Sequence, residues 1–214
     1  MIKQLLMGVV LGLLLMLAGG LAMVLGGLPN VAAGWRDPPI LAWLLHTTYE
    51  RSVARRAAGI EVPSTADPGH ALAGARAFEE ICTICHTPPG REPTVQSAGL
   101  NPSPPALTEL TARRTPEEAF WVIQNGVRMT AMPAFGPTHT DAELWQLVTF
   151  LWRARGLDGA GYDALLARAR RLPAGDGHAH RHGPDGADPP DQAPAAAPAP
   201  SGHDHHQGDD AHAH

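Results

Sequence analysis

The sequence predicts an all-α protein with one membrane-spanning helix at its N-terminus and a disordered C-terminal tail. Three observations lead to this fold class. Residues 5–28 form an apolar segment of 24 residues without a charge. Residues 115–126 and 140–156 carry complete signals for the start and end of a helix. Residues 174–214 are rich in His, Asp, Pro and Ala, a composition typical of disordered chain.

The N-terminal segment has the length of a membrane anchor. At about 1.5 Å per residue, residues 5–28 would form a helix of roughly 36 Å, which is enough to cross a bilayer. The alternative is a cleaved signal peptide, because the small residues at 30–34 could form a cleavage site for a signal peptidase. The apolar centre of a signal peptide, however, is usually only about 7–15 residues long. We therefore expect residues 1–34 to be a retained anchor. Basic residues on both sides of the segment leave its orientation open.

Residues 35–69 are expected to form a connector and a linker. Ile40, Leu41, Leu44 and Leu45 share one face of a predicted amphipathic helix, and arginines cluster in the second half of that helix. Two interpretations stay open: the helix packs on the next domain, or it lies in the membrane interface. Pro and Gly residues at 59–69 then separate this helix from the next domain.

The only two cysteines, Cys82 and Cys85, are followed directly by His86. A structural zinc site needs four ligands, and the chain has no second cysteine pair. A thioredoxin-like redox pair would follow a strand, whereas the preceding sequence has helical character. The remaining interpretation is covalent haem attachment, in which the two thiols bind the vinyl groups and the histidine binds the iron.

A second axial ligand would decide what such a haem does, because a vacant position would make an oxygen or peroxide site. The loop at 125–136 offers Met129 and Met132 among Gly, Pro and small residues. Methionine is usually a core residue, but a core role is less natural in this loop. Thioether ligation raises the reduction potential and suits a carrier of single electrons.

The helices on either side of this loop have clear boundaries. Thr115 is a predicted N-cap, followed by Pro and by Glu118 in a capping box, and Gly126 stands after the predicted end. The segment 140–156 repeats this pattern. The chain at 86–115 contains six prolines and two glycines, so we expect irregular chain packed around the haem, which supplies the missing apolar core.

Three further patterns accompany the cysteine motif. A small residue and an aromatic stand before the first Cys, at Gly74 and Phe78. The last predicted helix contains an aromatic followed by Leu, at Phe150 and Leu151, and a Pro-x-Leu segment follows the motif at 105–107. With these residues, the segment 70–156 resembles a class I c-type cytochrome with a single haem. The chain after it, 157–173, is predicted to be a helical extension.

The resemblance implies a specific set of site residues. One haem c would be attached covalently to Cys82 and Cys85, with His86 as an axial ligand of the iron. The Pro105 carbonyl would accept a hydrogen bond from the His86 ring and orient it. The Met-Pro ending of the ligand loop in the family points to Met132, rather than Met129, as the second axial ligand.

A narrower similarity covers about residues 30–162. The stretches "SVARRA", "CHTPPG" and "MTAMPAFGPTHTDAELW" resemble those of membrane-anchored bacterial cytochromes. Because haem attachment in bacteria takes place outside the cytoplasmic membrane, this similarity implies a single-pass protein of that membrane, with the haem domain on the periplasmic side.

We therefore expect a membrane-tethered monohaem cytochrome that transfers single electrons between periplasmic or membrane redox partners. It would be an electron carrier and not an enzyme, although it could be the cytochrome subunit of a redox complex. One alternative is a haem enzyme or gas sensor with a displaceable sixth ligand. The other is a metal-handling protein that uses the His-rich tail.

The tail accounts for the net negative charge of the chain. Residues 173–214 carry a net charge of −6, whereas the whole chain carries −5, so the acidity belongs to the tail and we expect no nucleic-acid partner. The eight histidines of the tail, with the aspartates, could bind divalent ions such as copper, zinc or nickel. Candidate ligands are His203, His205 and His206, and the alternative is a tail without a specific role.

Overall fold

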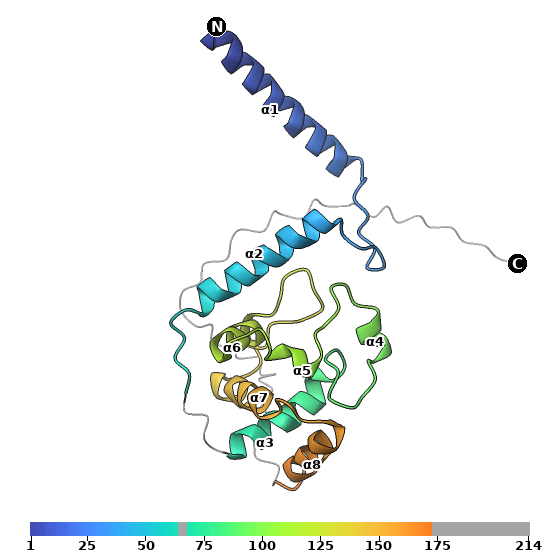
Figure 1. Ribbon diagram of the computed structural model, residues 1–214, viewed down its shortest axis with the longest axis vertical. Coiled ribbons are helices and arrows are strands. Elements are labelled where there is room, and N and C mark those ends of the chain that lie inside the picture. The colour runs from blue at the N-terminus through green and yellow to red at the C-terminus, as the bar shows by residue number, and fades with distance from the viewer. Residues whose placement is uncertain (64–67, 173–214) are drawn as a thin grey trace, which may run out of the picture. The chain divides into compact units, whose positions relative to one another are not determined.

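The computed structural model describes residues 1–63 and 68–172, and within these residues it contains helices joined by loops and no strand (Figure 1). The predicted all-α fold is confirmed. In chain order the elements are α1 (Ile2–Leu25), α2 (Pro39–Ala57), α3 (Pro68–Ala77), the π-helical turn η1 (Phe78–Cys82), α4 (Val95–Ala98), α5 (Leu107–Leu110), α6 (Pro116–Asn125), α7 (Asp141–Arg153) and α8 (Gly159–Ala169). The predicted tail, with His203, His205 and His206, lies outside the described residues.

Helix α1 has the length and composition of a membrane anchor. It contains 24 residues with a mean hydropathy of 2.5 in its most apolar window, and within the described part of the chain it is the one helix that could cross a membrane. None of its residues is buried against the rest of the protein. A helix with an apolar surface on every side is suited to a lipid environment.

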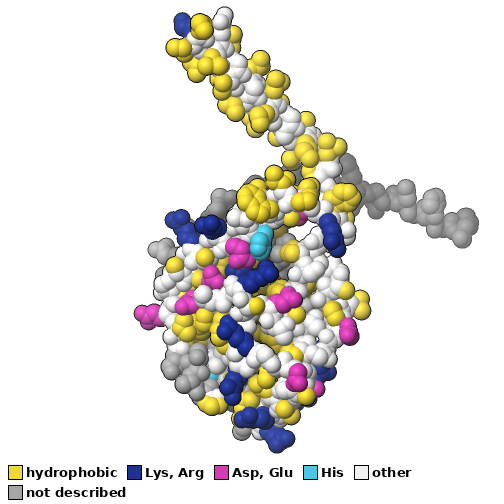
Figure 2. Space-filling view, in the orientation of Figure 1, with side chains coloured by type: hydrophobic (Ala, Val, Ile, Leu, Met, Phe, Trp, Pro, Cys, Tyr) yellow, Lys and Arg dark blue, Asp and Glu magenta, His cyan; other side chains and the backbone are white. Residues whose placement is uncertain are grey.

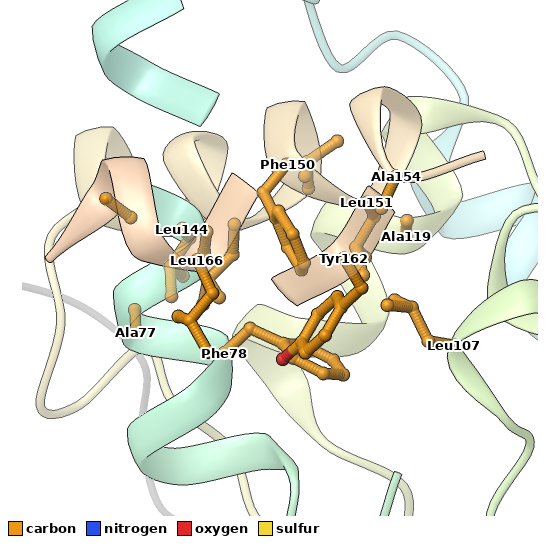
Figure 3. Packing of buried hydrophobic residues seen from close by; sticks show 14 of the residues in the cluster. Ala77, Phe78, Leu107, Ala119, Leu144, Phe150, Leu151, Ala154, Tyr162 and Leu166 are labelled. Carbon is orange, nitrogen blue, oxygen red and sulfur yellow. The ribbon is translucent and has the colours of Figure 1, made fainter. Parts of the chain in front are cut away.

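Helices α3 and α7 cross closely at a glycine. A Cβ atom at Gly74 would overlap the carbonyl oxygen of Gln146 and would lie 2.8 Å from Cβ of Phe150. Only a residue without a side chain allows this approach. The rings of Phe78 and Phe150 pack beside the crossing, with centroids 5.2 Å apart (Figure 3). The small and aromatic residues noted in the sequence before the cysteine motif and in the last helix therefore meet where α3 and α7 cross.

The two capped helices begin where the sequence predicts. In α6 the Glu118 amide donates to the Thr115 hydroxyl at 3.3 Å, and the Thr115 amide donates to the Glu118 carboxylate at 3.1 Å. Thr140 and Glu143 form the same capping box in α7. Helix α6 ends at Asn125, directly before Gly126, whereas α7 ends at Arg153, three residues before Gly156. The end of α7 is thus slightly earlier than the glycine signal suggests.

Helix α8, predicted as an extension, contributes to the main hydrophobic cluster. Tyr162, Leu166 and Ala169 are buried, with exposed fractions of 3% or less. They join Phe78 of η1 and Phe150 of α7 in the same cluster (Figure 3). The core that surrounds the helix crossing therefore continues beyond residue 156.

Helix α2 is divided along its length. Its second half packs on α6 and buries Val53 and Ala57. Its first half is exposed, with no buried residue before Val53. Packing on the next domain, one of the two interpretations of the sequence, therefore describes the second half of the helix only.

Candidate functional site

The cysteine motif lies on a tight turn at the end of α3. The last turn before it, η1, is π-helical, and the Thr83 amide donates to the Phe78 carbonyl at 3.2 Å. The amides of Cys85 and His86 then both donate to the Cys82 carbonyl, at 3.1 and 2.8 Å. Local backbone hydrogen bonds thus bring the two thiols and the imidazole onto one compact turn. The two cysteines are not joined by a disulfide.

His86 is held by the carbonyl of Pro105. Its Nδ1 atom lies 2.8 Å from that oxygen, which is the hydrogen bond predicted for the Pro-x-Leu segment. A carbonyl oxygen only accepts, so Nδ1 carries the proton and Nε2 keeps a lone pair that can bind a metal. Burial lowers the pKa of His86, and the hydrogen bond to Pro105 opposes this shift. The neutral imidazole, the form that binds iron, is therefore favoured.

The chain between His86 and Thr115 is tied at several points. Its elements α4 and α5 are only four residues long, as expected for a proline-rich stretch. The Leu107 amide donates to the Thr87 carbonyl at 2.9 Å, and the Thr94 hydroxyl caps α4 by accepting from the Ser97 amide at 3.0 Å. These bonds fix the Pro105 carbonyl relative to the cysteine turn.

The structure separates the two candidate methionines. Met129 has a positive φ of 61° and is 91% exposed, so it lies at the tip of its loop. Met132 is half-buried, and both its carbonyl and its amide form hydrogen bonds. Its carbonyl accepts from the Val127 amide at 3.1 Å, and its amide donates to the Thr130 hydroxyl at 3.2 Å. Met132 is thus the methionine with a defined position.

Gly126 closes the base of this loop. It has a φ of 65°, and a Cβ atom there would lie 2.6 Å from the Ala134 amide nitrogen and from the carbonyl carbon of Pro133. The two ends of the loop therefore approach each other backbone to backbone. The glycine that the sequence marks as the end of α6 also sets the position of the Met-Pro segment.

Helix α8 contacts the chain on both sides of the cysteine motif. Before the motif, the Tyr162 hydroxyl donates to the Glu79 carboxylate at 2.6 Å. After the motif, Arg91 pairs with Asp163, and a Cβ at Gly90 would lie 2.7 Å from Cα of Gly159. Sequence reasoning missed these contacts, because they join residues about 70 to 80 positions apart. The apolar residues of α8 at helical spacing were the available signal for a buried face.

The donor set fits a haem group better than a bare metal ion. Among the described residues no three His, Cys, Asp or Glu side chains gather to hold an ion. Two thiols next to an oriented imidazole, with a thioether on a fixed loop, are instead the donors that a c-type haem uses. Burial, together with the neighbouring Cys85 thiol, raises the pKa of Cys82 to about 12, as expected for a thiol in apolar surroundings.

The comparison with known families covers the same segment. Residues 69–151 match the family described as cytochrome C oxidase, cbb3-type, subunit III. No curated protein and no solved structure matches the chain. The matched residues run from α3 to α7, and α1, α2 and α8 lie outside them. The match supports a c-type cytochrome haem domain in this segment, which contains the helix crossing at Gly74 and the hydrogen bond between His86 and Pro105.

Proposed function

We propose that the protein is a membrane-tethered carrier of single electrons with one covalently bound haem c. Cys82 and Cys85 would form the thioether bonds, and His86 and Met132 would be the axial ligands. The observation that carries this proposal is the 2.8 Å hydrogen bond from His86 Nδ1 to the Pro105 carbonyl. It orients the imidazole, fixes its tautomer and raises its basicity, as expected for the ligand of a haem iron.

The residues around the haem would hold both axial ligands in place. Haem c supplies a one-electron couple between ferric and ferrous iron. Pro105 orients the His86 ring, while the Thr130 hydroxyl and the Val127 amide hold the backbone of Met132. A thioether ligand favours the reduced iron and raises the reduction potential. A site whose ligands are already fixed by the protein needs little rearrangement when an electron arrives or leaves.

The cellular setting of the proposal rests on α1 and on the resemblance to bacterial cytochromes. Helix α1 would anchor the protein in the cytoplasmic membrane as a single span, with the haem domain on the periplasmic side. The matched family is described as an oxidase subunit, which supports a membrane redox complex as the partner. The protein would then be the electron-carrying subunit rather than the catalytic one.

Replacing each methionine separately tests the ligand assignment. Met132→Ala should remove the sulfur-to-iron charge-transfer band, open the reduced iron to carbon monoxide and lower the reduction potential. Met129→Ala is the matched control, because Met129 is exposed at the tip of the same loop, and it should leave all three properties nearly unchanged. Absorption spectra and a redox titration measure both variants.

The other outcomes have distinct meanings. If Met129→Ala has the strong effect, the ligand assignment is wrong but the carrier function stands. If neither variant alters the spectrum, the sixth position is held by another group, such as His139, or is vacant, and the haem enzyme alternative is favoured. Ready binding of carbon monoxide by the unchanged reduced protein would favour the haem enzyme or gas sensor instead.

A further inference from the structure

The first half of α2 exposes an unusually apolar surface. The side chains concerned lie in this half of α2 and, for Trp35, in the chain just before it. They are called here the apolar end of α2 and are 40% to 77% exposed: Trp35, Ile40, Leu41, Trp43, Leu44 and Leu45. Figure 2 shows hydrophobic side chains gathered over the start of α2. Large exposed apolar patches on otherwise folded domains mark sites of interaction.

The distribution of these residues around the helix indicates a lipid environment rather than the surface of another protein. At 100° per residue, the apolar positions from Ile40 to Leu45 cover more than half of the circumference. A helix that packs on one protein surface presents a narrower stripe. No Asp, Glu, Lys or Arg occurs in residues 38–49. This half of α2 is therefore suited to immersion in an apolar medium.

The second half of α2 is fixed to the haem domain. Glu50 pairs with Arg114 at 2.7 Å, and the Arg114 side chain is only 13% exposed. The same guanidinium lies 4.8 Å from the centre of the Tyr49 ring. Further along the helix, Val53 and Ala57 are buried where α2 packs on α6. An ion pair and apolar packing thus join this half of α2 to the domain.

The exposed half of α2 lies close in sequence to the proposed membrane span. Thirteen residues, 26–38, separate the end of α1 from the start of α2. Tryptophans are enriched where a bilayer meets water, and Trp35 and Trp43 both belong to the apolar end. The exposed residues Arg51, Arg55 and Arg56 lie further along the helix, where they would remain in water or contact acidic headgroups.

We propose that the apolar end of α2 inserts into the interface of the membrane that α1 crosses. The second half of the helix would then hold the haem domain next to the lipid surface as a rigid support. This inference rests on the proposed membrane tether. It assigns the apolar end to lipid rather than to another protein.

Spin labelling of the full-length protein in vesicles of phosphatidylcholine and phosphatidylglycerol tests the proposal. A nitroxide at Leu44→Cys should collide more often with oxygen, which concentrates in lipid, than with a water-soluble nickel complex. Val95→Cys is the matched control, because Val95 is an apolar residue of α4 that is 89% exposed, and its label should show the reverse preference. Leu14→Cys, in the middle of α1, reports the membrane span itself.

The three labels separate the possible failures. A label at Leu14 that prefers the nickel complex would contradict the membrane tether. A lipid-located Leu14 with a Leu44 label in water would overturn the inference about α2 alone. A Leu44 label shielded from both collision partners would mean that protein covers the apolar end, and this would also overturn the inference.

Discussion

At the scale of single residues, Gly74 has the strictest requirement in the fold. A methyl group there would meet backbone, the Gln146 carbonyl, as well as Cβ of Phe150. Neither can move without separating α3 from α7. The sequence identifies this glycine only through its spacing of eight residues before Cys82, whereas the structure supplies the physical reason.

Gly74→Ala should therefore destabilise the domain by about 2 kcal/mol or more, the cost of overpacking a core. Gly99→Ala is the control, because a Cβ there would make only ordinary contacts at 3.7 Å or more and φ is −89°. Urea unfolding of the two full-length holoproteins, monitored by haem absorbance, compares them. Equal midpoints for the two variants would show that the α3–α7 crossing adjusts more easily than its geometry indicates.

At the scale of elements, local signals and long-range contacts differ in how well they can be predicted. The starts of α6 and α7 are predictable because a capping box involves residues only three apart, such as Thr115 and Glu118. The hydrogen bond of His86 to Pro105 is also expected, through the resemblance to a family. The contacts of α8 are not, because Glu79 and Tyr162 lie 83 positions apart and no local pattern relates them.

Tyr162→Phe tests whether α8 supports the cysteine turn. The Tyr162 ring is fully buried, and its hydroxyl donates to a carboxylate, so losing the hydroxyl should cost about 1.5 kcal/mol. Burial and the neighbouring Glu79 raise the pKa of Tyr162, so the hydroxyl keeps its proton at neutral pH. Chemical unfolding and amide exchange at Thr83, Cys85 and His86 measure the effect.

Asp163→Asn provides the control on the same helix. It weakens the pair with Arg91, in which both side chains are more than half exposed, so the expected loss is below about 1 kcal/mol. Faster amide exchange at the cysteine turn in Tyr162→Phe, but not in Asp163→Asn, is the expected pattern. Unchanged exchange in both variants would mean that the turn is held by its own backbone bonds alone.

At the scale of the whole molecule, the chain combines a matched haem domain with segments that lie outside the match. Removal of residues 174–214 should leave the visible spectrum, the reduction potential and electron transfer unchanged. It should lower any binding of copper, zinc or nickel, measured by calorimetry on the full-length and shortened proteins. If removal of the tail abolished electron transfer, the result would instead support the metal-handling alternative.

The proposed membrane anchor gives a second prediction at this scale. The protein should remain with membranes after a wash in high salt, because burial of an apolar helix is not screened by ions. Detergent should release it with residues 1–34 intact, as mass spectrometry can determine. Recovery in the soluble fraction, with a new N-terminus near Gly34, would identify a cleaved signal instead.

The short link between α1 and α2 has a kinetic consequence. Because α2 is packed on α6, only the 13 residues between the two helices form a non-helical tether, and a coil of that length has a root-mean-square span of about 20 Å. A membrane partner beside the protein would meet the haem domain at an effective concentration on the order of millimolar. Electron transfer would then depend on the lateral density of the two proteins in the bilayer, and dilution of the surrounding solution would not slow it.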